Sequence, residues 1–444
     1  MRKNFLARIW QILRGIPRWL RPGLGIKRWF IFVMIGITVL GLGFGVLLID
    51  LYHNEATDST LHLLLTYVSL NFVPRILRAL IFGGVGIGFV VYGMVQLNRS
   101  LLSPFIRSGS DLFDLLSNFH RRDHGPRIVT IGGGHGLATL LRGLKALTSN
   151  LTAVVTVADD GGSSGRLRES HGILPPGDIR NCLAALSNDE ALLTQLFQYR
   201  FNSSPDLTGH SFGNLFITAL VDITGSFEEA VAESGRVLSV HGRVLPSTLR
   251  NVKLVASMEL PHSINEVRVE GESKIPAMAG RVRRVWLEPD DASAFPPVLK
   301  AILNADVIVV GPGSLYTSIL PNLLVHDLLA AIQSSRATKI YVCNIAMQAG
   351  ETDSFTCYDH VRALENHIGK DLFDIILCND NYADDIGSSQ WVRADEKTLS
   401  DSRSYCTDLV DDGHPWRHDS LKLAQVIMDI YYERTGPLGE NRLQ

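Results

Sequence analysis

Cysteine is scarce in this sequence, and its spacing argues against two kinds of site. The 444 residues contain five cysteines, an odd number, and no two of them form a C-x-x-C pair. A disulfide framework or a zinc site would need a paired arrangement, so neither is favoured, and scattered thiols suit a reducing cytosol. The five residues are Cys182, Cys343, Cys357, Cys378 and Cys406.

Two common catalytic motifs and an excess of positive charge are also absent. The chain has no G-x-x-x-x-G-K-[ST] loop and no H-E-x-x-H. P-loop ATPase and zinc-peptidase chemistry are therefore unsupported. The formal net charge is −3, and eight Lys and Arg residues before Asp50 leave −11 on residues 50–444. Nucleic acid is therefore not an expected partner.

Two long uncharged runs lie near the start of the chain. Trp29 to Ile49 has 21 residues without a charge, and Ala79 to Asn98 has 20. Each is long enough for a transmembrane helix. A cleaved signal peptide is the alternative for the first run, but the run is too long and no small-residue cleavage site follows it. Basic residues before the first run and after the second predict a cell-membrane protein with two spans and both ends in the cytoplasm.

The composition divides the whole chain into four segments. Residues 1–98 form the predicted membrane anchor, with spans at about 29–49 and 79–98, and residues 99–126 form a polar linker. A ligand-binding domain is expected over residues 127–436, and residues 437–444 form a tail.

The first candidate binding feature is a glycine loop. The apolar run Ile128 to Ile131 ends in Gly132, Gly133, Gly134 and Gly136, and a helical pattern begins at Leu137. Glycines let the backbone approach a ligand, and a helix N-terminus favours an anion such as phosphate. Leu137 stands where the usual dinucleotide fingerprint has its third glycine. A nucleotide site and a plain tight β–α turn both remain open at this point.

A second apolar run, residues 152–158, ends in a pair of acids. Asp159 and Asp160 are followed by glycines and by Ser163 and Ser164. An acid at this place in a Rossmann-like sheet meets a ribose hydroxyl or a metal ion. The alternative is a solvated turn. The turn should lie beside the first glycine loop, because successive parallel strands are usually neighbours.

Later segments add polar groups at expected helix starts. Asp178 is predicted to be an N-cap, and Arg180 in the following turn is a candidate phosphate ligand or else a surface arginine. Residues 210–214 open another helix, with Asn214 in its first turn. The run 306–310 then leads into a second glycine junction, which contains Gly311, Gly313, Ser314 and Thr317.

The overall pattern predicts an α/β fold. Strands at 339–344 and 373–379 alternate with helices at 355–367 and 421–433, whereas residues 237–287 show a period of two with Val244 among the expected antiparallel strands. We therefore expect a Rossmann-like, mostly parallel sheet with a β-rich insertion, preceded by two transmembrane helices. Ligands of such sheets bind at the carboxyl ends of the strands.

Six motifs in this order resemble those of the YvcK-like gluconeogenesis factor family, relatives of the CofD 2-phospho-L-lactate transferases. The resemblance covers roughly residues 127–432. Its motifs are Gly132 to Gly136, Ala158 to Arg166, Pro176 to Asn181, Gly209 to Asn214, Gly311 to Ser318 and Gly350 to Asp353, with Arg417-His418-Asp419 near the end.

The resemblance implies a fold that binds UDP-sugars, notably UDP-N-acetylglucosamine, and a role in cell-wall synthesis, cell shape and growth on gluconeogenic carbon. It adds Asn181 and Arg417 to the expected binding residues. The transferase relatives use a nucleotide-linked phospholactate and a divalent metal, which makes Mg²⁺ a candidate cofactor. His135 stands where the family usually has Thr, so the backbone contacts of that loop are expected but not a hydroxyl contact.

Two functions from different classes follow. The first is a membrane-anchored, UDP-sugar-binding regulator, with cell-wall synthesis proteins and a second copy of the chain as candidate partners. The second is a transferase acting on a nucleotide-activated, phospholactate-like molecule, with Asp159 and Asp160 as its candidate catalytic or metal-binding residues. Consumption of the ligand, as opposed to binding alone, distinguishes the two.

Overall fold

The computed structural model describes residues 125–435 except 188–190, 203–206, 261–264, 279, 384–385 and 388, together with scattered positions between 37 and 88. The tail and most residues of the predicted anchor and linker lie outside this set. Among the described residues, no single helix is long and apolar enough to cross a membrane, and one bent pair, Leu315–Leu323 with His326–Ser334, meets that description only when taken together. Residues Arg121–Gln444 form one compact unit.

A seven-stranded sheet is the centre of this unit, and all its neighbouring strands are parallel. Every residue of β1, β2, β7 and β9 is buried. Such runs of apolar and β-branched residues are typical of parallel strands covered by helices on both faces. The strand order is β10-β9-β8-β7-β1-β2-β3. The bounds are β1 Ile128–Gly132, β2 Leu151–Val155, β3 Arg243–Pro246, β7 Val307–Val310, β8 Thr338–Val342, β9 Ile375–Asn379 and β10 Ser404–Thr407.

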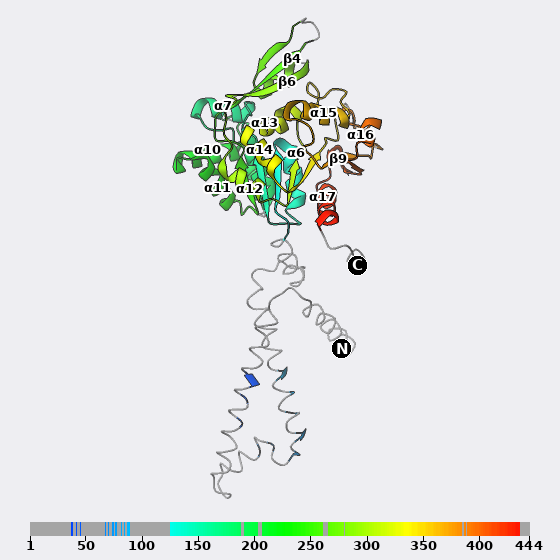
Figure 1. Ribbon diagram of the computed structural model, residues 1–444. Helices are drawn as coiled ribbons and strands as arrows, with labels where there is room; N and C mark the ends of the chain where they lie inside the picture. Colours follow the sequence, from blue (N-terminus) through cyan, green and yellow to red (C-terminus); the bar gives the residue numbers. More distant parts are fainter. Residues whose placement is uncertain are drawn as a thin grey trace. The chain divides into compact units, whose positions relative to one another are not determined.

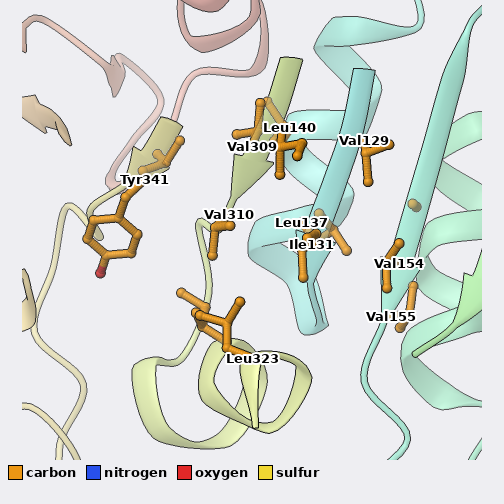
Figure 2. Packing of buried hydrophobic residues seen from close by; sticks show 14 of the residues in the cluster. Val129, Ile131, Leu137, Leu140, Val154, Val155, Val309, Val310, Leu323 and Tyr341 are labelled. Carbon is orange, nitrogen blue, oxygen red and sulfur yellow. The ribbon is translucent and has the colours of Figure 1, made fainter. Parts of the chain in front are cut away.

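Helices cover the sheet and define its core. α11 and α12 contact β3 at one end of the sheet, and α16 contacts β10 at the other (Figure 1). Side chains of β1, β2, β7 and α6 form one buried cluster (Figure 2). The helix bounds are α6 Gly134–Leu144, α7 Gly162–His171, α8 Gly177–Leu186, α9 Ala191–Gln198, α10 Phe212–Thr224, α11 Phe227–Val237, α12 Pro296–Leu303, α13 Leu320–Leu323, α14 His326–Ser334, α15 Cys357–Ile368, α16 Glu396–Ser400 and α17 Ser420–Thr435.

The strand order places a switch point beside β1. The chain leaves β1 towards β2 and β3 on one side, whereas β7 and the later strands lie on the other. Adjacent loops at such a point diverge to opposite faces of the sheet and leave a crevice where ligands bind. Both predicted glycine loops follow the two strands at this point, β1 and β7.

The β-rich insertion is real but shorter than expected. It is a three-stranded antiparallel sheet of β4 (Lys253–Glu259), β5 (Val267–Glu270) and β6 (Arg281–Glu288), and β4 and β6 project from the unit in Figure 1. The assignment of Val244 to this insertion was wrong. Val244 pairs with Ala153 in the central sheet, where the short strand β3 lies parallel to β2.

Two smaller features complete the unit. Between β5 and β6 the chain forms the short turns η1 (Glu272–Lys274) and η2 (Pro276–Met278). Near the C-terminus, β11 (Val410–Asp411) and β12 (His414–His418) form an antiparallel hairpin. Both features lie close to the candidate site described next.

Candidate functional site

A pocket of about 330 Å³ lies where the two glycine loops meet. Its wall combines residues of both loops with a hydroxyl and carboxyls from three other segments of the chain. The lining residues are Gly133, Gly134, His135, Gly136, Thr156, Asp159, Asp178, Glu272, Gly313, Ser314, Thr317 and Ser318. Eight of these were predicted from sequence: Gly133, Gly134, Gly136, Asp159, Asp178, Gly313, Ser314 and Thr317.

The first glycine loop places the start of α6 in the wall of this pocket. Gly133 precedes the helix in an extended conformation and has no side chain with which to cap it, and the Gly134 N–H donates to the carboxyl of Asp178. The other N–H groups of the first turn have no partner within the helix and suit an anion. Gly134 has a φ of +65°, which favours glycine. Gly132 is the last residue of β1, and its carbonyl oxygen accepts hydrogen bonds from the Thr156 N–H and the Asn322 amide.

The two loops are in direct contact. A Cβ atom on Gly136 would lie 2.5 Å from the Pro312 carbonyl oxygen. In the second loop, Gly311 has a φ of +85° and donates its N–H to the Ile131 carbonyl oxygen. Asn344 fixes this loop, because its amide both accepts from the Gly313 N–H and donates to the Gly313 carbonyl oxygen. The predicted glycines therefore set the approach of the loops.

Three carboxyl groups line the pocket. Burial raises the pKa of Asp178 to about 6, and the nearby Asp159 raises it further. Burial and the charges of Asp159 and Asp178 raise the pKa of Glu272 to about 8. The pKa of Asp159 is also raised, mainly by burial. Arg180 and Arg168 oppose these shifts, but burial and the mutual repulsion of the carboxyls outweigh them.

The predicted acid pair separates in the structure. Asp159 lines the pocket, whereas the carboxylate of Asp160 accepts a hydrogen bond from the Ser273 N–H at 2.9 Å. A Cβ atom on Gly271 would lie 2.1 Å from an Asp160 carboxylate oxygen, so the two segments touch. Asp160 thus attaches the η1 turn of the insertion, and that turn carries Glu272 to the pocket.

A buried polar network lies beside the pocket and contains several predicted residues. Arg180 is 6% exposed, and its guanidinium donates hydrogen bonds to Ser211, Asn214 and Asn181. Asn214 in turn donates to the Ser163 hydroxyl. The Ser164 hydroxyl accepts from the Gly177 N–H at 3.1 Å. These residues connect the first turns of α7, α8 and α10.

This network changes two expectations. The surface alternative for Arg180 was wrong, because Arg180 is buried and bonded within the protein. Asp178 was expected to be the N-cap of its helix, but α8 begins at Gly177 after Pro176, and Asp178 lies in the first turn. Its carboxyl accepts a hydrogen bond from the Gly134 N–H, which opposes the effect of burial on its pKa.

The second loop contributes hydroxyls that an acid holds in place. The Thr317 hydroxyl donates to Glu351 at 2.9 Å, and Gln348 donates to the same carboxylate oxygen at 2.9 Å. Glu351 is 4% exposed, and burial raises its pKa to about 7. Ser314 lines the pocket from the same loop.

Positive charge collects near His135. Burial lowers the pKa of His135, and the charges of Arg417, Arg180, Arg142 and Arg200 lower it further. Arg417 is exposed on β12. The charges of these arginines therefore act on His135, and Arg180 also acts on the carboxyls of Asp178 and Asp159.

Some residues of the site had no signal in the sequence. Glu272 belongs to a turn in the insertion, and only the tertiary structure brings it to the pocket. Thr156 and Ser318 are common residue types without a motif of their own. Glu351 lay inside one of the six motifs, but nothing in that motif indicated its contact with Thr317. Among the described residues, no group of three or more acids, histidines or cysteines is arranged to hold a metal ion by itself.

Comparison with known proteins agrees with this geometry. The family model described as "2-phospho-L-lactate transferase CofD" matches residues 128–410. The "Gluconeogenesis factor" of Bacillus subtilis is 45% identical over 318 residues, covering 69% of this chain and 99% of that protein. A relative from Clostridium acetobutylicum is 39% identical over 445 residues, covering 94% of this chain and 93% of its own length.

A solved structure shows the same fold. The crystal structure of a UPF0052 family member from Bacillus halodurans is 44% identical, covers 68% of this chain and 98% of its own, and superimposes with a TM-score of 0.64. The family model matches more than half of the chain. The relatives are more than 30% identical to this chain over the region that contains the six motifs. The chain therefore belongs to the CofD-like family and is a relative of the gluconeogenesis factors.

Proposed function

We propose that this protein binds a UDP-sugar, UDP-N-acetylglucosamine first among them, in the pocket between the two glycine loops. The observation that carries the proposal is the position of this pocket at the switch point beside β1, with the first turn of α6 in its wall. Helix N-terminal N–H groups and close-approaching glycines suit a pyrophosphate. The positive charges of four arginines act on His135 in the pocket wall, and the same charges favour a bound anion.

The carboxyl wall suits the hydroxyl-rich part of such a ligand. Asp159, Asp178 and Glu272 face the pocket. Carboxyl oxygens accept hydrogen bonds from ribose and sugar hydroxyls. The same oxygens suit Mg²⁺, which typically takes one or two protein carboxylates and completes its coordination with phosphate oxygens and water. Asp159 and Asp178 would hold that ion, and its charge would offset their repulsion.

Regulation at the membrane is the proposed role. Relatives carry the name gluconeogenesis factor, and the sequence predicts an anchor with a cytoplasmic domain. We therefore propose a membrane-anchored sensor of UDP-N-acetylglucosamine that adjusts cell-wall synthesis and cell shape during gluconeogenic growth. Cell-wall synthesis proteins and a second copy of the chain are the proposed partners.

The second candidate is a transferase. The matching family model is named for 2-phospho-L-lactate transferase, and the pocket contains carboxyls with raised pKa values, which is common at catalytic sites. The substrate would be a nucleotide-activated, phospholactate-like molecule. Asp159 is the pocket residue that would serve it, since Asp160 faces the insertion.

A binding measurement tests the first candidate. The fragment 121–444 is suitable, because the Bacillus subtilis relative aligns over 99% of its length with 69% of this chain. With UDP-N-acetylglucosamine at about 100 times its Kd, the free energy of unfolding should rise by about 2.7 kcal/mol, which raises Tm by several degrees. Removal of Mg²⁺ with EDTA should reduce this shift.

Matched glycine variants assign the shift to the pocket. Gly134→Val places a branched side chain at a φ of +65° in the pocket wall, whereas Gly225→Val places one at a φ of +74° at the end of α10, outside the pocket. Neither added Cβ meets protein backbone, so both variants should fold. Only Gly134→Val should abolish the ligand-induced shift. Equal loss in both variants would contradict the proposed binding site.

Prolonged incubation of the protein with its ligand distinguishes a binding protein from an enzyme. Wild-type protein with Mg²⁺ should return UDP-N-acetylglucosamine intact. Release of UDP or UMP at a rate abolished by Asp159→Asn would replace the regulator with an enzyme. In cells, a strain carrying Gly134→Val should share the growth and shape defects of a deletion strain on gluconeogenic carbon, while the Gly225→Val strain should resemble wild type.

A further inference from the structure

Four of the five cysteines converge, although they are far apart in the sequence. Cys378 in β9 and Cys406 in β10 are register partners in neighbouring parallel strands. Cys343 directly follows β8, and its N–H donates to the Leu377 carbonyl oxygen at 2.9 Å, which places it level with Cys378. Register partners in a parallel sheet project to the same face, with strands about 4.8 Å apart. The three thiols thus form a row across three strands.

The fourth cysteine packs onto this row. Cys357 is the first residue of α15. A hydrogen bond with Cys343 raises the pKa of Cys357, and Cys357 is also hydrogen-bonded to Cys378. Cys378 and Cys406 are hydrogen-bonded to each other, which raises the pKa of Cys406. The order of contact is therefore Cys343, Cys357, Cys378, Cys406, and we call these four residues the thiol row.

The four cysteines of the thiol row differ in their exposure to solvent. Cys343, Cys357 and Cys378 are each 1% exposed, whereas Cys406 is only partly buried. A reagent in solvent therefore meets Cys406 first. The fifth cysteine, Cys182, is fully buried in α8 and lies outside the row.

The shape of the row favours reaction in pairs over one shared metal ion. A tetrahedral site needs its thiolates around one centre. Here the outer strands of the row are separated by a third strand, and no described group of three ligands is arranged to hold an ion. Neighbouring members are different, because a strand spacing of about 4.8 Å falls within the Cα separation that a disulfide spans.

We propose that the thiol row is an oxidation site, in which Cys406 and Cys378 form a reversible disulfide on reaction with a hydroperoxide. The Cys406 thiol attacks the peroxide, becomes a sulfenic acid and releases an alcohol, or water when the oxidant is hydrogen peroxide. The Cys378 thiol then attacks the sulfenic sulfur, and the second oxygen leaves as water. One hydroperoxide is reduced and two thiols are oxidised to one disulfide, which a dithiol reductant returns to two thiols.

The reaction should be slow. Hydrogen bonding and burial raise the pKa of both Cys378 and Cys406, so that little thiolate is present at neutral pH. The thiolate is the attacking species. Exposure to hydrogen peroxide should therefore extend over minutes to hours.

The test counts thiols in the full-length protein. After exposure to hydrogen peroxide, the protein is denatured with an alkylating reagent, and mass spectrometry counts alkylated cysteines and locates the cross-link. Wild type should retain three of its five thiols, joined by a 378–406 disulfide, and should recover all five after dithiothreitol. Cys182→Ser is the matched control and should lose two thiols at the wild-type rate. Cys406→Ser should lose none over the same interval.

Several results would overturn the proposal. Five free thiols in wild type after prolonged exposure would make the row inert packing. Thiol loss in Cys406→Ser at the wild-type rate would place the entry point elsewhere. Retention of one Zn²⁺ per chain after gel filtration with added zinc, lost in Cys406→Ser, would make the row a metal site. Cys406→Ala repeats the test with a different side chain, because the partly exposed position tolerates a change better than the buried ones.

Discussion

At the scale of single residues, burial decides what each polar group in the site can do. Arg180 was a candidate phosphate ligand by sequence, but its guanidinium is already bonded to Ser211, Asn214 and Asn181. Its charge still acts on the pocket, since it lowers the pKa of His135. Arg180 therefore organises the helix starts around the pocket, and its charge would act on an anion bound there.

Replacement of Arg180 should thus affect folding as well as binding. Arg180→Ala removes a buried guanidinium, and the amide oxygens of Asn214 and Asn181 then lose their hydrogen-bond donor. The free energy of unfolding should therefore fall by about 1.5–3 kcal/mol. Urea unfolding of the fragment 121–444 measures this change. Arg200→Ala, at an exposed position that also lowers the pKa of His135, is the control and should leave stability nearly unchanged. Equal stability of Arg180→Ala and wild type would contradict the buried network.

Glu272 should make stability depend on pH. Its pKa is raised from 4.5 to about 8 in the folded protein. Between those values the folded state holds a proton that the unfolded state has lost, so the free energy of unfolding falls as the pH rises. Asp178 and Glu351 act in the same direction, with pKa values raised to about 6 and about 7.

Glu272→Gln removes the ionisable group and keeps its shape. The variant should lose less stability than wild type between about pH 4.5 and pH 8, and at pH 8 it should be more stable by roughly 1–3 kcal/mol. Thermal unfolding across this pH range measures the difference. Glu169→Gln, at an exposed position on α7, should follow the wild-type curve. A wild-type curve that rises towards pH 8 in parallel with Glu272→Gln would contradict the raised pKa of Glu272.

At the scale of elements, local pattern predicted the central strands and missed those defined by the tertiary structure. β1, β2, β7 and β9 are continuous apolar runs buried on both faces, and such runs are legible in a sequence. β3 has only four residues and ends in Pro246, so its period resembled that of the insertion that follows. β10 is a short strand at the sheet edge with no fully buried residue, and it left no comparable signal.

The same division applies to the site. Glycine loops after β1 and β7 were predicted because conformational freedom and close approach require a particular residue type at a particular place. Glu272 and the thiol row depend on contacts between segments far apart in the chain. For example, the row joins residues 343 and 406 through Cys357 in α15 and Cys378 in β9, and no spacing rule within one sequence predicts such a contact.

The insertion offers a prediction at this scale. Asp160 accepts the Ser273 N–H, and Gly350 meets Pro276 so closely that a Cβ would lie 2.2 Å from the Pro276 carbonyl oxygen. These two contacts attach η1 and η2 to the glycine-loop side of the domain. Asp160→Ala should therefore increase hydrogen exchange at Gly271–Lys274 by several-fold, while β1 remains protected.

Asp160→Asn is the matched variant, because its amide oxygen can still accept the Ser273 N–H. Exchange at Gly271–Lys274 should then stay close to wild type, although the charge is gone. Mass spectrometry of the fragment 121–444 with both variants separates the two effects. Equal increases in exchange for Ala and Asn would mean that charge, and not the hydrogen bond, holds the turn.

At the scale of the whole molecule, the segment before the domain distinguishes relatives of different length. The Bacillus subtilis factor matches 69% of this chain over 99% of its own length, whereas the Clostridium acetobutylicum relative matches 94% of this chain. The second alignment is too long to fit within the domain, so it extends into the N-terminal segment. We propose that this segment anchors the domain at the membrane, where wall precursors are assembled.

The anchor makes a definite prediction about topology. Eight Lys and Arg residues precede Trp29, whereas only Arg75 and Arg78 lie in the loop between the two uncharged runs. Because positive charge is retained on the cytoplasmic side, a reporter fused after Gln444 should be cytoplasmic, and a reporter inserted near Thr57 should be outside the cell. Paired alkaline phosphatase and fluorescent protein fusions measure both positions. A reporter after Gln444 that is found outside the cell would exclude the arrangement with two spans.

Deletion of the predicted anchor, residues 1–123, should release the domain from the membrane fraction. A fragment that stays in the membrane fraction after a high-salt wash would show that a further anchor exists.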